Sequence, residues 1–193
     1  MAKSGEQLKN LKFRPVTPGR WEDMAALFGE RGACGGCWCM SWRLTAGAFE
    51  KNKGAPNKRA MKKIIMSGEV PGLLAYLGSE PIGWCSVAPR EQFPRLERSR
   101  NFQPVDDKQV WSVVCLFIAK PYRAQGVSVA LLKAAAEYAR KMGGKIVEGY
   151  PVEPNEKWPD AFAWTGTTSA FVKAGYKEVL RRSPRRPIMR QHL

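Results

Sequence analysis

Residues 112–132, SVVCLFIAKPYRAQGVSVALL, constrain the fold more than any other part of the chain. The apolar run over 110–119 is typical of a central strand that is buried on both faces. After Lys120-Pro121 the sequence predicts a helix over 128–142, with apolar residues along one stripe. A strand that passes directly into a helix exposes the first N–H groups of that helix, which bind anions with the help of the helix dipole. The turn is therefore predicted to bind phosphate.

The residues in this turn favour a pyrophosphate. Gly126 and Ser128 have small side chains where a phosphate would approach the backbone, and Arg123 adds a positive charge. The turn has neither the Gly-Lys-Ser/Thr loop of nucleoside triphosphatases nor the G-x-G-x-x-G fingerprint of dinucleotide-binding proteins. The ligand is therefore expected to belong to another class.

The predicted elements of the whole chain follow a mixed order, β-α-α-β-β-β-α-β-α-β-β. The predicted helices after the capping pair Thr17-Pro18 cover about 18–28, 56–66, 128–142 and 167–174. The predicted strands cover 12–16, 72–77, 81–87, 110–119, 145–152, 177–180 and 187–190. The basic segment 89–107, which contains three prolines, is predicted to lack regular structure.

Residues 123–128, RAQGVS, resemble the Gln/Arg-x-x-Gly-x-Gly/Ala signature of the GNAT superfamily of N-acetyltransferases. The element order from about 12 to 191 also matches that family, and Ala174-Gly175-Tyr176 resembles the turn after its last helix. The resemblance implies an α+β fold, the GNAT acyl-CoA N-acyltransferase fold, with a mixed central sheet of about six to seven strands flanked by about four helices. It implies one domain over 1–193 that ends in a basic hairpin at about 177–191.

The resemblance also implies a cosubstrate, acetyl-CoA, and a reaction in which a primary amine of a small molecule or peptide attacks the thioester directly. Such an enzyme is an acyltransferase of the EC 2.3.1 type. A backbone N–H near Leu116 would stabilise the oxyanion. The implied cofactor-binding residues are Leu116, Phe117 and Ile118 for pantetheine, and Arg123, Ala124, Gln125, Gly126, Val127 and Ser128 for the pyrophosphate.

The chain departs from the family at the acid and the base. Phe171 stands where many members have the tyrosine that protonates coenzyme A, and Ser112 stands where some have a glutamate base. The catalytic candidates are Tyr150 as the acid, Glu148, and Ser112 as the holder of a relaying water, with Glu153 as a further carboxylate. For each of them a purely structural role stays open, as does transfer to an amine that arrives neutral.

The stretch CGGCWCMSWR offers Cys34, Cys37 and Cys39, but a closed zinc site needs four ligands. The chain has one histidine, His192, so no metal is expected and the thiols are predicted to be packed in the interior. The substrate-binding candidates in this region are Trp38, Trp42 and Arg43, as one wall of a pocket for an apolar, aromatic or cationic group. The alternative is that these tryptophans fill the core.

Composition leaves several partners open. The net charge of +15 attracts polyanions, which include coenzyme A but also nucleic acid. The competing functions are a nucleic-acid-binding or ribosome-binding protein and a catalytically silent coenzyme A binder on the same scaffold. Five cysteines without an export signal favour reduced thiols and a cytoplasmic location, and no apolar run is long enough to span a membrane. The protein is expected to be a monomer or a homodimer.

Overall fold

A computed structural model describes residues 10–153 and 163–193, which form seven strands and six α-helices. The predicted α+β architecture with a mixed sheet is confirmed. In chain order the elements are β1 Leu11–Pro15, α1 Trp21–Phe28, α2 Ala46–Lys51, α3 Ala55–Met66, β2 Gly72–Leu77, β3 Glu80–Pro89, α4 Pro94–Glu97, β4 Trp111–Ile118, α5 Val127–Lys141, β5 Ile146–Gly149, α6 Thr168–Lys173, β6 Lys177–Arg181 and β7 Pro187–His192.

Two short helices were not predicted. α2 begins at a capping threonine, Thr45, whose side chain accepts a hydrogen bond from Ala48 N–H. α4 lies in the basic segment that was expected to be irregular, and that prediction is wrong for residues 94–97 because Pro94 suits the first turn of a helix.

The seven strands form one sheet in the order β1-β2-β3-β4-β5-β7-β6, with β4 at its centre. Every neighbouring pair is antiparallel except β4 and β5, which are parallel. That parallel pairing covers only residues 111–113 of β4, so the rest of the strand continues without β5. β4 has a bulge at Val114, next to the last residue that pairs with β5. The bulge is seen in the pairing with β3, where Val113 lies opposite Val87 and Cys115 lies opposite Ser86, so Val114 has no partner.

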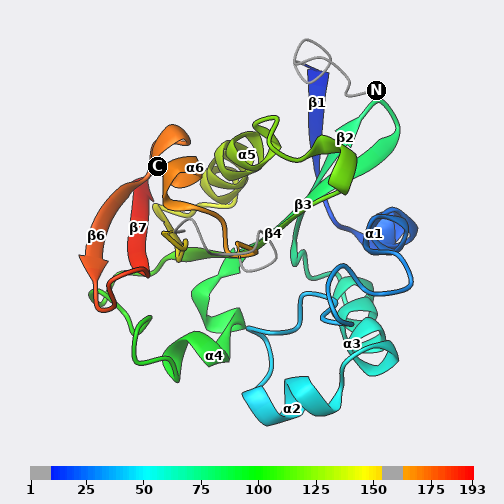
Figure 1. The fold of residues 1–193 in the computed structure, drawn as a ribbon, viewed down its shortest axis with the longest axis horizontal. Helices are drawn as coiled ribbons and strands as arrows, with labels where there is room; N and C mark the ends of the chain where they lie inside the picture. The colour runs from blue at the N-terminus through cyan, green and yellow to red at the C-terminus, as the bar shows by residue number, and fades with distance from the viewer. Residues whose placement is uncertain (1–9, 154–162) are drawn as a thin grey trace.

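Helices cover both faces of the sheet (Figure 1). α5 and α6 pack on one face over a core that includes Leu116 of β4, and α1 and α3 pack on the other. Cys115 and Phe117, the neighbours of Leu116 in the strand, contact the α1 and α3 side. The central strand therefore presents one face to the helix that follows it and the other face to the N-terminal helices.

The predicted basic hairpin is formed by β6 and β7, and β6 is an edge strand of the sheet. Among the described residues, no helix has the length and apolar character needed to cross a bilayer.

Candidate active site

The predicted phosphate-binding residues lie together at the N-terminus of the 15-residue helix α5. Gly126 precedes the helix with φ of 83°, in the left-handed region that favours glycine, and Ala124 has φ of 58°. Arg123 Nε donates to the Ile118 carbonyl at 3.0 Å, and Gln125 Nε2 donates to the Pro121 carbonyl at 2.8 Å. Val127 and Ser128 open the helix itself. These contacts hold the turn against the end of β4, with the helix dipole directed at it.

The backbone N–H of Leu116, expected to stabilise the oxyanion, already has a partner. It donates to the Trp164 carbonyl at 2.7 Å, on the side of β4 that β5 leaves unpaired. A thioester that uses this N–H must therefore displace the Trp164 carbonyl.

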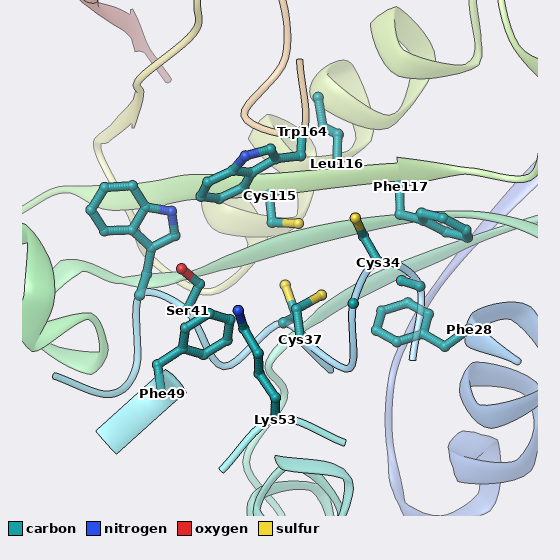
Figure 2. Close-up of a pocket in the computed structure, with 14 residues that line it drawn as sticks. Phe28, Cys34, Cys37, Ser41, Phe49, Lys53, Cys115, Leu116, Phe117 and Trp164 are labelled. Atoms are coloured by element: carbon teal, nitrogen blue, oxygen red, sulfur yellow. The ribbon is translucent and has the colours of Figure 1, made fainter. Parts of the chain in front are cut away.

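A cavity of about 270 Å³ lies against β4 on the face that carries Cys115 and Phe117, opposite the face covered by α5 (Figure 2). Its lining is mostly apolar and aromatic, and Lys53 is its only charged side chain among the described residues. Lys53 Nζ forms an ion pair with Glu50 at 2.6 Å, which balances that charge. The lining residues are Phe28, Ala33, Cys34, Gly35, Cys37, Cys39, Ser41, Trp42, Phe49, Lys53, Cys115, Leu116, Phe117 and Trp164.

The structure separates the three predicted acceptor-binding residues. Trp42 lines the cavity and packs against Trp164, with ring centroids 6.0 Å apart. Trp38 is instead 1% exposed in the core, stacked on Trp21 at 5.9 Å, as the alternative interpretation held. Arg43 borders a second, open cavity and lies 4.7 Å from the centroid of the Phe93 ring. Only Trp42 therefore lies where an acceptor in the first cavity would touch it.

The cysteines are arranged in a way that the sequence analysis missed. Four of the five line the same cavity, and Figure 2 shows the sulfur atoms of Cys34, Cys37 and Cys115 directed into it. The described residues contain no group of three or more histidine, cysteine or acidic side chains arranged to hold a metal. The Cys-x-x-Cys-x-Cys spacing was the available signal, but it does not reveal that Cys115 of β4 joins the group.

Backbone strain accompanies this cysteine cluster. Three non-glycine residues of the loop have positive φ: Ala33 at 69°, Trp38 at 42° and Cys39 at 56°. Each such residue costs about 1–3 kcal/mol and persists only where its surroundings hold it in place. Gly32 makes the conformation possible, because a Cβ atom there would lie 2.3 Å from Trp38 Nε1.

The three catalytic candidates form a buried hydrogen-bond network, and none of them lines the cavity. Tyr150 Oη donates to Glu148 Oε1 at 2.7 Å and lies 2.9 Å from Ser112 Oγ. Arg90 donates to Tyr150 Oη at 2.7 Å, and Arg190 donates to Glu148 Oε2 at 2.6 Å. Burial, together with the Glu148 charge, raises the pKa of Tyr150 well above its ordinary value. A catalytic role for these residues stays a prediction.

Phe171 and Glu153 also lie away from the cavity lining. Phe171 is fully buried, and its ring packs so closely on Gly149 that a Cβ atom there would lie 2.0 Å from Phe171 Cε1. Glu153 forms an ion pair with Arg181 of β6. Among the described residues, the titratable groups that line the cavity are therefore the four thiols and Lys53.

Comparison with known proteins identifies a family and agrees with the fold. The model of a family described as the acetyltransferase (GNAT) family matches residues 40–157, more than half of the chain. A comparison with curated proteins gives no match.

Many solved structures share the fold at low sequence identity. The PaiA N-acetyltransferase from Thermoplasma acidophilum, in complex with coenzyme A, is 14% identical with a TM-score of 0.54, covering 95% of this chain and 99% of that one. A GNAT-family acetyltransferase from Listeria monocytogenes is 10% identical with a TM-score of 0.58, covering 95% of both chains. An agmatine N-acetyltransferase is 12% identical with a TM-score of 0.55, covering 96% of this chain and all 100% of that one.

Proposed function

The chain belongs to the GNAT family of acetyltransferases, and we propose that it is an acetyl-CoA-dependent N-acetyltransferase that acetylates a primary amine. The observation that carries this proposal is the position of the cavity. It lies against Cys115, Leu116 and Phe117 of the same strand that leads into the phosphate-binding turn. An acetyl-CoA molecule bound along β4 with its pyrophosphate at α5 would therefore bring its thioester to the cavity.

The lining of the cavity favours one class of acceptor. Phe28, Trp42, Phe49, Phe117 and Trp164 surround it with aromatic surface, and the one cation among its described lining residues is already paired. The apolar walls disfavour the charged form of any amine, because burial in apolar surroundings penalises a charge. We propose a small primary amine attached to an apolar or aromatic group, which reacts in its neutral form.

The transfer itself needs few protein groups. The neutral amine attacks the carbonyl carbon of the thioester, and the Leu116 N–H stabilises the oxyanion once the Trp164 carbonyl has left it. The C–S bond then breaks, and the departing coenzyme A thiolate takes up the proton that the attacking nitrogen loses, so the products are the amide and the free thiol of coenzyme A. Because a free alkylammonium has a pKa of about 10, most of the amine in solution at neutral pH is charged. Turnover at low amine concentration is therefore expected to rise with pH.

Two measurements test the proposal. Thermal unfolding with and without acetyl-CoA reports binding, and the release of free coenzyme A thiol reports transfer to an amine panel. The panel should contain 2-phenylethylamine, tryptamine, agmatine, an aminoglycoside and a peptide with a free N-terminus. We expect stabilisation by acetyl-CoA and the fastest release with the aromatic amines.

Each negative result has a distinct meaning. If acetyl-CoA does not stabilise the protein, the proposed function is wrong. If it stabilises the protein but no amine releases thiol, the protein is a coenzyme A binder without transferase activity. Salt-sensitive RNA or DNA binding near physiological ionic strength would instead support the nucleic-acid-binding alternative.

A further inference from the structure

The second cavity, with a volume of about 510 Å³, adjoins the same chain segment as the first. In the segment 39–44, residues 39, 41 and 42 line the first cavity, whereas residues 40, 43 and 44 line the second. The two cavities have no lining residue in common within the described part of the chain. The second cavity has the size of a site for a small organic molecule, so it is a candidate binding site of its own.

The Arg43 guanidinium, which lines this cavity, is only partly satisfied. Its Nη1 donates to Gln92 Oε1 at 3.1 Å, and its Cζ lies 4.7 Å from the centroid of the Phe93 ring. Its Nε and Nη2 atoms are buried, and neither has a hydrogen-bond partner among the described residues. The N–H groups of Nε and Nη2 point in the same direction and form the edge through which a guanidinium binds a carboxylate with two parallel hydrogen bonds.

A buried cation without a counter-charge is unfavourable, and proteins rarely keep one. No carboxylate of the described residues lies within ion-pair distance of Arg43. Burial lowers the pKa of Arg43, which reflects the cost of holding this charge away from water, yet a guanidinium stays protonated at neutral pH. The unpartnered edge therefore calls for an anion that the described part of the chain does not supply.

An anion can reach Arg43 from the cavity. Gln92, the partner of Nη1, lines the same cavity, and this single hydrogen bond is the only one that the guanidinium makes among the described residues. A small rotation of the side chain can therefore turn the free edge toward a bound anion. Lys63 also lines the cavity and has no ion pair among the described residues, so it adds a second positive charge.

The rest of the lining indicates which kind of anion fits. Met40, Leu44, Ala60 and Ile64 give the cavity apolar walls, which suit a hydrocarbon group. Glu69 lines the cavity as well, and its negative charge disfavours a multiply charged anion such as phosphate. A singly charged anion with an apolar tail satisfies both conditions.

We propose that the second cavity binds a small organic carboxylate with an apolar tail, and that the Nε and Nη2 edge of Arg43 binds its carboxylate group. Lys63 attracts the same group, and the tail packs between Leu44 and Ile64. The site uses no residue of the first cavity and needs no acetyl-CoA, so it can be tested whether or not the proposed function holds.

Calorimetric titration of the full chain with sodium hexanoate tests this site. Hexanoate should bind and should raise the Tm, because a ligand that binds only the folded state stabilises it. Acetate should bind more weakly because it lacks the tail, and hexanamide should bind more weakly because it lacks the charge. Absence of hexanoate binding overturns the proposal. Equal binding of hexanamide also overturns it, as does tighter binding of inorganic phosphate.

Substitutions assign the binding to Arg43. Arg43→Met should weaken hexanoate binding by about 10-fold or more, the usual effect of losing hydrogen bonds to a charged group. Arg43→Lys should also weaken it, because a lysine keeps the charge but not the two-pronged edge. The matched control is Arg59→Met, which removes an exposed cation of α3 outside the cavity lining and should leave the affinity unchanged. Equal losses in Arg43→Met and Arg59→Met would show a general effect of net charge and overturn the assignment.

Two further measurements exclude a partner within the chain. Glu69→Gln should tighten hexanoate binding several-fold, because it removes a repelling charge from the lining. Arg43→Met should raise the Tm of the ligand-free protein, because an apolar side chain of similar length replaces an unpaired buried cation. If Arg43→Met instead lowers the ligand-free Tm and Glu69→Gln lowers it equally, the two residues pair with each other and the proposal is overturned.

Discussion

Replacing Glu148 with glutamine distinguishes a structural role from a catalytic one in the buried network. The carboxylate is 1% exposed and accepts hydrogen bonds from Tyr150 at 2.7 Å, Arg90 at 3.3 Å and Arg190 at 2.6 Å. Removing one partner of a buried ion pair costs about 3–5 kcal/mol, because the other charge is left without compensation. Glutamine keeps the shape of the glutamate side chain and one of its two acceptor oxygens. We therefore expect the free energy of unfolding to fall by the lower limit of this range, about 3 kcal/mol.

For a domain of this size each kcal/mol lowers the Tm by about 2–4 °C, so Glu148→Gln should lower it by about 6–12 °C. Calorimetry and urea unfolding should both show this loss. Glu137→Gln is the matched control, because Glu137 is 59% exposed in its pair with Arg140 and should change stability by less than about 0.5 kcal/mol. If the Glu148→Gln variant has the same Tm as the unsubstituted protein yet loses acetyl transfer, the structural reasoning is refuted and Glu148 acts in catalysis.

Three further substitutions test the packing of the fold and the two ends of the site. Gly149→Ala should destabilise the protein by about 1–3 kcal/mol through overpacking against Phe171, whereas Gly47→Ala in α2 has open space and should be neutral or stabilising; equal thermal shifts would contradict the packing. Gly126→Ala forces a side chain onto φ of 83° and should weaken acetyl-CoA binding in calorimetric titration, and unchanged affinity would place the pyrophosphate elsewhere. Trp42→Phe should raise the KM for an aromatic amine several-fold and leave the KM for acetyl-CoA unchanged, because Trp42 lines the acceptor cavity; a change in the KM for acetyl-CoA alone would assign the cavity to the cofactor.

The strand, turn and helix proposed to bind the cofactor were predictable because they depend on local sequence. An apolar strand, a turn with Gly126 and an amphipathic helix each carry their own pattern, and β4 and α5 lie within one or two residues of the predicted bounds. The order of helices and strands along the chain was predicted from similar local patterns. These features need no knowledge of distant contacts.

The acceptor end was not predictable, because it depends on contacts between distant segments. Trp38 and Trp42 are both tryptophans and lie only four positions apart, yet Trp38 is buried in the core and Trp42 lines the cavity. Their separation follows from positive φ at Trp38 and Cys39, which non-glycine residues rarely adopt and which no local pattern indicates. In the same way, Arg90 reaches Glu148 across 58 positions in the chain, so the burial of the catalytic candidates could not be foreseen.

In the proposed reaction, acetyl-CoA competes with the protein's own backbone for the Leu116 N–H, which donates to the Trp164 carbonyl. Exchanging one neutral hydrogen bond for another gains almost nothing, so the acetyl group should add little to the affinity of coenzyme A. The same N–H becomes valuable only when it faces the negative oxygen of the transition state, because a charge-assisted hydrogen bond is stronger. Coenzyme A and acetyl-CoA are therefore expected to bind about equally well, and the turnover of this protein should follow the ratio of the two rather than the concentration of acetyl-CoA alone.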